Sequence, residues 1–283
     1  MTQASSEIPL LLEAEQLWQL LQTEQPIKLL DVSRANVYRQ VHIPQAIAVS
    51  PQDLLRSDEM ATGLLPKDVD LQALINKIGV YPEHHVVIYD DEGGAWAGRV
   101  LWNLHCAGFY QVSVLNGGLH AWLASNLPVS NQVPEQNIDI EKCFQINTSQ
   151  QAKHRIELSE LQQLILQDGD KIQLWDCRSQ EEYRGERRMS RRAGHIPNAI
   201  CYPHSTAICY ENHLKLQPLS LIQQQLQQLG FDLNKPVVVY CQSHHRSGLA
   251  YLLALLLGWS VRAYDGAWSE WGNHRETAVV CGA

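Results

Sequence analysis

The chain repeats itself, and this internal repeat limits it to folds that can be built twice and joined. Four sequence landmarks occur in the first half and again, in the same order, 145 to 153 residues later. An order kept at nearly constant spacing over four landmarks indicates a duplicated domain. The landmark pairs are Asp31 with Asp176, His42 with His195, Val86 with Val237, and Asn116 with Asp265.

Each copy reads as alternating strands and helices. The runs VVIY (86–89) and VVVY (237–240) are typical of strands buried on both faces of a parallel sheet. Apolar helices are predicted after them, over residues 99–106 and 249–257, each followed by a glycine that can end the helix. We therefore predict an α/β fold with two tandem domains, each a mainly parallel sheet flanked by helices. Further helix–strand pairs are predicted at 13–21 with 27–30 and at 158–166 with 172–175.

A polar stretch without periodicity separates the copies. Residues 127–149 carry two prolines and are predicted to be the linker between domains at 1–126 and 150–283. The length of 283 residues suits two domains, and the longest apolar run, 249–257, is far below the ~20 residues of a membrane span. The N-terminus lacks the basic start of a secretion signal, and the seven cysteines form no even disulfide framework. A cytoplasmic protein is therefore expected.

The net charge of -8 is unevenly distributed. Residues 1–142 hold 17 acidic and 8 basic residues, whereas residues 143–283 hold 13 and 14. A chain without a basic face is a poor nucleic-acid binder. The second copy nevertheless has an arginine-rich insertion, RGERRMSRR (184–192), whose guanidinium groups could receive a small anion or simply form a solvated loop.

The segment after each central strand indicates where chemistry takes place, because ligands of such sheets bind beyond the carboxyl ends of the strands. The first copy has DDEGGAWAGR from Asp90, and the second has CQSHHRSG from Cys241. Only the second offers a nucleophile. Loop amides and a helix N-terminus can converge on an anion there and favour the nucleophilic thiolate form of Cys241. Arg246 adds positive charge, and His244 and His245 can donate hydrogen bonds or add charge when protonated.

The motifs together resemble a known family. D-x-R, G-H-I-P-x-A, a strand ending in C-x4-R-S, and D-G-x-W-x-x-W resemble the rhodanese superfamily over residues 8–277. A cysteine in the C-terminal copy alone is similar to the tandem-domain thiosulfate and 3-mercaptopyruvate sulfurtransferases. The loop itself is most similar to bacterial tandem rhodaneses with a Cys-Gln-x-His-His-Arg-Ser sequence.

The resemblance implies a sulfurtransferase that works in two steps. Cys241 would take the outer sulfur of a donor such as thiosulfate, release sulfite, and pass the sulfur to cyanide or a thiol acceptor. Loop amides can stabilise the anionic persulfide, so neither a metal nor another cofactor is expected. The resemblance assigns substrate binding to Gln242, Ser243, His244, His245, Arg246 and Ser247, and structural support to Asp176, Arg178, Asp265 and Trp268.

The sequence also departs from the family pattern, which leaves the donor open between thiosulfate and mercaptopyruvate. Glu182 stands before Tyr183 where vertebrate-type enzymes have a substrate-contacting arginine. Ser243 stands where thiosulfate-selective enzymes have a lysine, and the C-G-x-G-V loop of mercaptopyruvate enzymes is absent. We hypothesise that Arg246, with Arg187 or Arg188, supplies the missing positive charge.

The sequence leaves three alternatives to this function: a phosphatase, a binding module without catalysis and a zinc site. Phosphatases of this fold have a C-x5-R loop, whereas Cys241 and Arg246 form the shorter C-x4-R. A binding module without catalysis suits the first copy, where Asp90 replaces the nucleophile beside Asp91 and Glu92, so that copy is expected to be a scaffold. A zinc site is disfavoured because Cys201 falls in a predicted strand. The cysteines and histidines at this zinc-like spacing are Cys201, His204, Cys209 and His213.

We expect a monomer that binds neither nucleic acid nor membrane.

Overall fold

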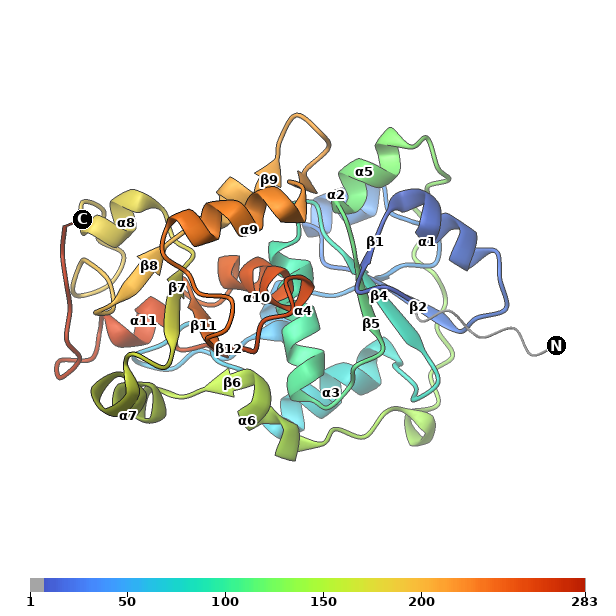
Figure 1. Cartoon of the computed structure of the whole chain (residues 1–283). Helices are drawn as coiled ribbons and strands as arrows, with labels where there is room; N and C mark the ends of the chain where they lie inside the picture. Colours follow the sequence, from blue (N-terminus) through green and yellow to red (C-terminus); the bar gives the residue numbers. More distant parts are fainter. Residues whose placement is uncertain (1–7, 283) are drawn as a thin grey trace.

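The structure, a computed structural model, describes residues 8–282 (Figure 1). Residues 1–7, which belong to the N-terminal segment predicted to lack a secretion signal, lie outside the described residues. Two five-stranded sheets have the orders β1-β5-β4-β2-β3 and β6-β12-β11-β7-β8, which is the same order in each copy. Every pairing within these sheets is parallel. The central strands are β4 (His85–Tyr89) and β11 (Val237–Tyr240), so the predicted duplicated α/β fold is confirmed.

The elements of the two copies correspond one to one, apart from short additions. The first copy contains β1 (Leu11–Leu12), α1 (Ala14–Leu21), β2 (Ile27–Asp31), α2 (Ala35–Gln40), β3 (Ile47–Ala48), η1 (Pro51–Leu54), α3 (Asp68–Ile78), β4, α4 (Ala95–Cys106), β5 (Val112–Leu115) and α5 (Gly118–Ala124). The second contains β6 (Arg155–Ile156), α7 (Leu158–Asp168), β7 (Gln173–Asp176), α8 (Gln180–Arg184), β8 (Ala199–Cys201), η4 (His204–Ala207), β9 (Ile208–Cys209), β10 (Lys215–Leu216), α9 (Leu219–Gln228), β11, α10 (Arg246–Leu256), β12 (Val261–Tyr264) and α11 (Ala267–Trp271). Between them lie η2 (Ile140–Lys142), η3 (Thr148–Gln150) and α6 (Gln151–His154).

Helices α4 and α10 join the copies at the centre of the molecule, with one sheet on either side (Figure 1). They approach closely because Gly98 faces Gly248: a Cβ added to Gly98 would lie 2.2 Å from the Gly248 carbonyl oxygen. The largest cluster of buried apolar side chains contains residues of both copies, such as Leu101 and Leu253. The two copies therefore share this central cluster, while each copy also has a smaller cluster of its own.

Both helices end at glycines with a left-handed φ, as predicted, but α4 begins four residues earlier than expected. Gly93 and Gly94, with φ of 84° and 97°, turn the chain before Ala95. The first turn, Ala-Trp-Ala-Gly (95–98), carries no strong apolar periodicity, so the sequence does not predict it.

An arm from each copy reaches over the other copy's sheet. Leu65, at the end of the first copy's arm (56–65), donates its N–H to Asp265 Oδ2 at 2.7 Å. Leu216, in the β9–β10 hairpin of the second copy, donates to Asn116 Oδ1 at 2.8 Å. Asn116 and Asp265 are equivalent positions of the repeat, so the two contacts mirror each other. The arm of the first copy consequently lies beside the Cys241 loop.

The segment predicted as a linker contains the short η2 turn and runs into η3 and α6. No helix within residues 8–282 is long and apolar enough to cross a bilayer.

Candidate active site

Cys241 lies directly after the central strand β11, at the carboxyl edge of the second sheet. Its side chain is buried, with 1% exposure. The loop can turn sharply because His244 adopts a left-handed φ of 52°. Helix α11 holds the base of the loop: Trp268 N–H donates to the Cys241 carbonyl at 2.9 Å, and Ser269 N–H to the Gln242 carbonyl at 2.8 Å.

The loop amides form an open cradle. Within the described part of the chain, no backbone N–H group from Gln242 to Ser247 donates to a protein acceptor, whereas Gly248 N–H bonds the His245 carbonyl. These donors stand at the N-terminus of α10, where the helix dipole also favours negative charge. The cradle is therefore suited to an anion on the Cys241 sulfur.

The first copy shows the same cradle with an anion in it. Asp90 occupies the position of Cys241, and its Oδ1 accepts the N–H groups of Glu92 and Gly94 at 3.0 and 2.8 Å. Its Oδ2 accepts Ala97 N–H at 3.0 Å. Burial raises the pKa of Asp90, while these three donors lower it in part. The first two donors correspond to the N–H groups of Ser243 and His245, which the second copy leaves open beside a thiol.

The positive charge of Arg246 is paired with a carboxylate, which the sequence did not predict, and its role in binding substrate stays a prediction. Its Nη1 and Nη2 bind the two carboxylate oxygens of Glu182 at 2.6 and 2.9 Å. Burial alone would raise the pKa of Glu182, but the hydrogen bonds and charge of Arg246 bring it below its ordinary value. Glu182 also closes the capping box of α8 with Ser179, a sequence signal that could have marked it as buried.

His244 is completely buried, and burial disfavours the charged form of its ring, while its role in binding substrate stays a prediction. The pKa of His244 lies well below its usual value, mainly because the ring is buried and secondarily because of the positive charge of Arg99. Its Nδ1 lies 2.7 Å from Ser247 Oγ. Ser247, equally buried, donates its hydroxyl to Cys241 Sγ at 3.4 Å. Ser247 thus contacts the sulfur from inside the protein, and His244 contacts Ser247.

The remaining loop residues contact the rim of the site. The His245 ring stacks on Trp96 of the first copy, with centroids 4.0 Å apart, and its Nε2 lies 3.4 Å from Glu92. Gln242 Nε2 donates to the Met189 carbonyl and to Ser190 Oγ, both in the arginine-rich insertion. The Ser243 carbonyl lies against Gly63 so closely that a Cβ at Gly63 would be 2.0 Å away.

Arg99 is a site residue that sequence reasoning missed. It comes from α4 of the copy without a nucleophile, is fully buried, and donates to the carbonyls of Gly63 and Leu54 at 2.7 and 2.8 Å. The same guanidinium reaches the His244 carbonyl at 3.3 Å. An arginine inside an apolar helix was the available signal, since a buried charge needs such partners.

The four residues expected to support the site are all buried beneath it. Arg178 binds Asp176, donates to the Gly194 carbonyl at 2.8 Å, and stacks its guanidinium 4.5 Å from the Trp268 ring. Asp265 accepts from Arg155 Nε at 2.9 Å as well as from the arm of the first copy.

Arg187 and Arg188 are exposed, and neither side chain makes an ion pair or hydrogen bond with the catalytic loop in the described chain. Their contact with substrate stays a prediction. Cys201 is buried in β8, and residues 8–282 contain no cluster of three or more side chains placed to hold a metal ion.

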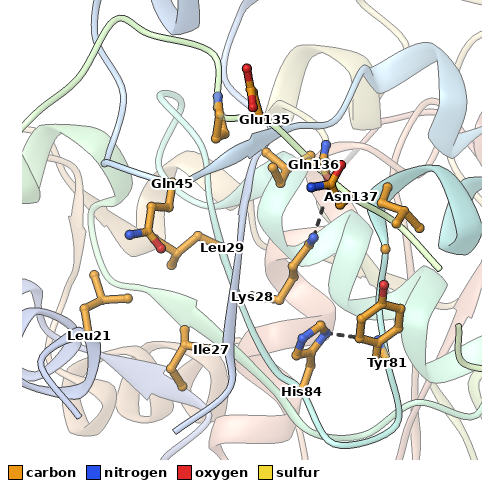
Figure 2. A pocket seen from close by; sticks show the side chains of 14 residues that line it. Leu21, Ile27, Lys28, Leu29, Gln45, Tyr81, His84, Glu135, Gln136 and Asn137 are labelled. Atoms are coloured by element: carbon orange, nitrogen blue, oxygen red, sulfur yellow. Dashed lines mark hydrogen bonds between the residues drawn. The ribbon is translucent and has the colours of Figure 1, made fainter. Parts of the chain in front are cut away.

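A separate pocket of about 360 Å³ lies at the opposite end of the first sheet, where β2 and β4 begin (Figure 2). Lys28 Nζ donates to Gln136 Oε1 at 3.2 Å, and Tyr81 N–H donates to His84 Nδ1 at 3.0 Å. Its lining contains no cysteine, serine or threonine, so it offers no nucleophile comparable to Cys241.

Known proteins resemble this chain over most of its length. The family model of the rhodanese-like domain matches residues 13–125 and 157–274. The thiosulfate sulfurtransferases of Azotobacter vinelandii and Pseudomonas aeruginosa are each 36% identical over 275 residues, covering 97% of this chain and 98% of theirs. The 3-mercaptopyruvate sulfurtransferase of Rattus norvegicus is 32% identical over 87% of this chain and 85% of its own.

The fold is also similar to a solved structure. The anaerobic ergothioneine biosynthesis enzyme of Chlorobium limicola superposes with a TM-score of 0.84 at 22% identity, over 97% of this chain and 70% of that one. At this identity the likeness concerns the fold alone.

Proposed function

The chain belongs to the rhodanese family, and from this membership and the geometry of the loop we propose that it is a thiosulfate sulfurtransferase with Cys241 as its sulfur carrier. The sulfurtransferase class follows from the family and from relatives that match nearly the whole chain. The donor and the carrier residue are the proposed parts.

In the first half-reaction, the Cys241 thiolate attacks the outer sulfur of thiosulfate. A bond forms between Sγ and that sulfur, the sulfur–sulfur bond of thiosulfate breaks, and sulfite leaves with the electron pair. The negative charge then resides on the outer persulfide sulfur. The open backbone amides from Gln242 to Ser247 can converge on this position and stabilise the charge.

In the second half-reaction, a nucleophile such as cyanide or a thiolate attacks the outer sulfur. The persulfide bond breaks, and its electron pair returns to Sγ as the thiolate. No proton has to be transferred when thiosulfate and cyanide are the substrates, so a neutral His244 ring fits this chemistry.

One observation carries the proposal: the cradle that the first copy fills with the Asp90 carboxylate is open in the second copy and contains a cysteine. The same backbone design therefore binds an anion in one copy and can bind the anionic sulfur in the other. Its small size suits a single sulfur atom better than a phosphate, whose family loop is longer.

The experiment is steady-state kinetics with thiosulfate and mercaptopyruvate side by side, cyanide as acceptor, and Cys241→Ala as the null. We expect parallel lines in double-reciprocal plots, a higher kcat/KM for thiosulfate, and no turnover by the variant. Preference for mercaptopyruvate would overturn the donor, and an active Cys241→Ala would overturn the carrier. Turnover of p-nitrophenyl phosphate would favour the phosphatase alternative.

The proposal places the enzyme in the cytoplasm as a monomer. Its seven cysteines are all free, which suits a reducing compartment. Both arms that reach across the copies come from one chain, so the loop is completed without a second subunit.

A further inference from the structure

We propose that His244 and Ser247 form a chain of hydrogen-bond donors that stabilises the Cys241 sulfur as a leaving group when the persulfide is discharged. This inference rests on the proposed function, because it assigns a task within the second half-reaction. Ser247 then acts directly on the reacting sulfur, and His244 is a positioning residue that acts through Ser247.

The geometry places three groups in a row. Ser247 Oγ lies 3.4 Å from Cys241 Sγ with its hydroxyl as the donor, and His244 Nδ1 lies 2.7 Å from the same Oγ. The exposed fractions of His244 and Ser247 are both 0%, so water does not compete for these contacts. A hydrogen bond shielded in this way is stronger than one at the surface.

The proton on the His244 ring determines which atom donates in each of these hydrogen bonds. Burial keeps the His244 imidazole neutral, with its pKa well below the usual value, so the ring holds one proton. Its Nε2 is buried and has no hydrogen-bond partner within residues 8–282. An orphaned N–H donor is less tolerable than an orphaned acceptor, which favours the proton on Nδ1. Nδ1–H then donates to Ser247 Oγ, and the serine proton is left for the sulfur.

The surroundings hold the imidazole in this orientation. Arg99 donates to the His244 carbonyl, and the Trp102 ring packs edge to face against the imidazole with centroids 4.3 Å apart. The charged or titratable groups around it are Arg99, His245 and Arg155, all of which disfavour a second proton on His244. The first copy thereby fixes the donor chain of the second.

The donor chain of His244 and Ser247 affects the discharge of the persulfide more than its formation. The Ser247 hydroxyl donates to Sγ, whereas we assign the charge of the outer sulfur to the loop amides. During sulfur loading, negative charge leaves Sγ, so this hydrogen bond weakens. During discharge, negative charge returns to Sγ as the persulfide bond breaks, so the hydrogen bond strengthens in the transition state.

The test separates the two half-reactions in Ser247→Ala. We expect kcat/KM for cyanide to fall about tenfold, while kcat/KM for thiosulfate stays within about threefold of wild type. Both are measured at a pH at which alkylation of Cys241 by iodoacetamide has reached its plateau. The midpoint of that alkylation profile is expected to move to higher pH, because the thiolate has lost a donor.

Two variants of His244 test the relay. His244→Asn keeps a donor near the Nδ1 position and tolerates the left-handed φ, so it should retain most of the cyanide kcat/KM. His244→Ala lacks the donor and should resemble Ser247→Ala. Ser113→Ala, which removes a buried hydroxyl from β5 far from the sulfur, is the matched control for lost stability.

Equal loss in both half-reactions, or no loss in either, would overturn the inference. So would an unchanged alkylation profile in Ser247→Ala. Intact mass after thiosulfate treatment distinguishes this failure from failure of the proposed function: a variant that still gains one sulfur on Cys241 keeps the carrier role while the donor chain is rejected.

Discussion

The Arg246–Glu182 pair determines how much positive charge the catalytic loop offers to an anionic donor. Arg246 is the one arginine of the loop, and its guanidinium is held by a carboxylate that is only 3% exposed. The pair keeps Arg246 in place but cancels its charge. Attraction of thiosulfate must therefore come mostly from the loop amides and the helix N-terminus.

Removing the carboxylate charge tests this balance. We expect Glu182→Gln to lower the KM for thiosulfate about threefold, because the Arg246 charge is no longer compensated. Glu181→Gln makes the same charge change at the exposed neighbouring residue and should leave KM nearly unchanged. An unchanged KM in Glu182→Gln would show that Arg246 does not act on the donor.

Sequence alone predicts Cys241, since the nucleophile, strand and loop are contiguous. It does not predict the partner of Arg246, because Glu182 is 64 residues away along the chain. Arg99 is harder still: it lies 145 residues from His244, in the copy that lacks the nucleophile. Local patterns identify residues of one loop, while the contacts that set their charge depend on the tertiary fold.

At the level of elements, the contact between α4 and α10 links the two copies. Each helix follows a central strand, and each presents a glycine where the other passes. Arg99 directly follows Gly98, so the spacing of the helices also sets the position of the guanidinium that holds His244. The element that joins the copies thereby supports the catalytic loop.

Gly98→Ala tests this link. Alanine ordinarily favours a helix over glycine by about 1 kcal/mol, yet here its Cβ would lie 2.2 Å from the Gly248 oxygen. We expect the free energy of unfolding to fall by about 2 kcal/mol in urea titrations, with a loss of turnover as Arg99 shifts. A variant as stable and active as wild type would show that the helix contact is not tight.

Periodicity predicted the central strands and the helices after them, because long apolar runs are strong signals. It could not predict the arms, residues 56–65 and the β9–β10 hairpin. Their strands are two residues long or single bridges, and their partners Asp265 and Asn116 belong to the other copy. Segments stabilised by distant contacts carry little local pattern.

At the scale of the whole molecule, a buried polar cluster ties α4, α6 and α10 together. His105 Nδ1 lies 2.9 Å from Tyr251 Oη, which lies 2.8 Å from His154 Nδ1. Burial lowers the pKa of His105 to about 3 and that of His154 to about 4, from 6.5. Both rings thus stay neutral in the folded protein at pH values where the unfolded chain takes up protons.

The sign of the pH effect follows. Groups with a lowered folded pKa contribute full stability above 6.5 and lose it as the pH falls toward 4. We expect the free energy of unfolding to decrease by about 1.4 kcal/mol per pH unit for each such histidine over this range. Urea unfolding at pH 5 and pH 7 measures it.

His105→Gln should make this slope shallower by about one proton, whereas His120→Gln, an exposed histidine on α5, should not change it. Equal slopes in wild type and His105→Gln would contradict the account of the buried cluster.

The difference in net charge between the two copies agrees with the residue that each copy has at its cradle. The acidic copy fills its own cradle with Asp90, while the nearly neutral copy keeps Cys241 in an open one.

The central claim is that this open cradle carries a sulfur atom. Mass spectrometry of the intact protein after thiosulfate treatment tests it most directly. We predict one adduct per chain of about 32 Da on Cys241, absent in Cys241→Ser and removed by cyanide as thiocyanate. An unchanged mass, or an adduct on another cysteine, would contradict it.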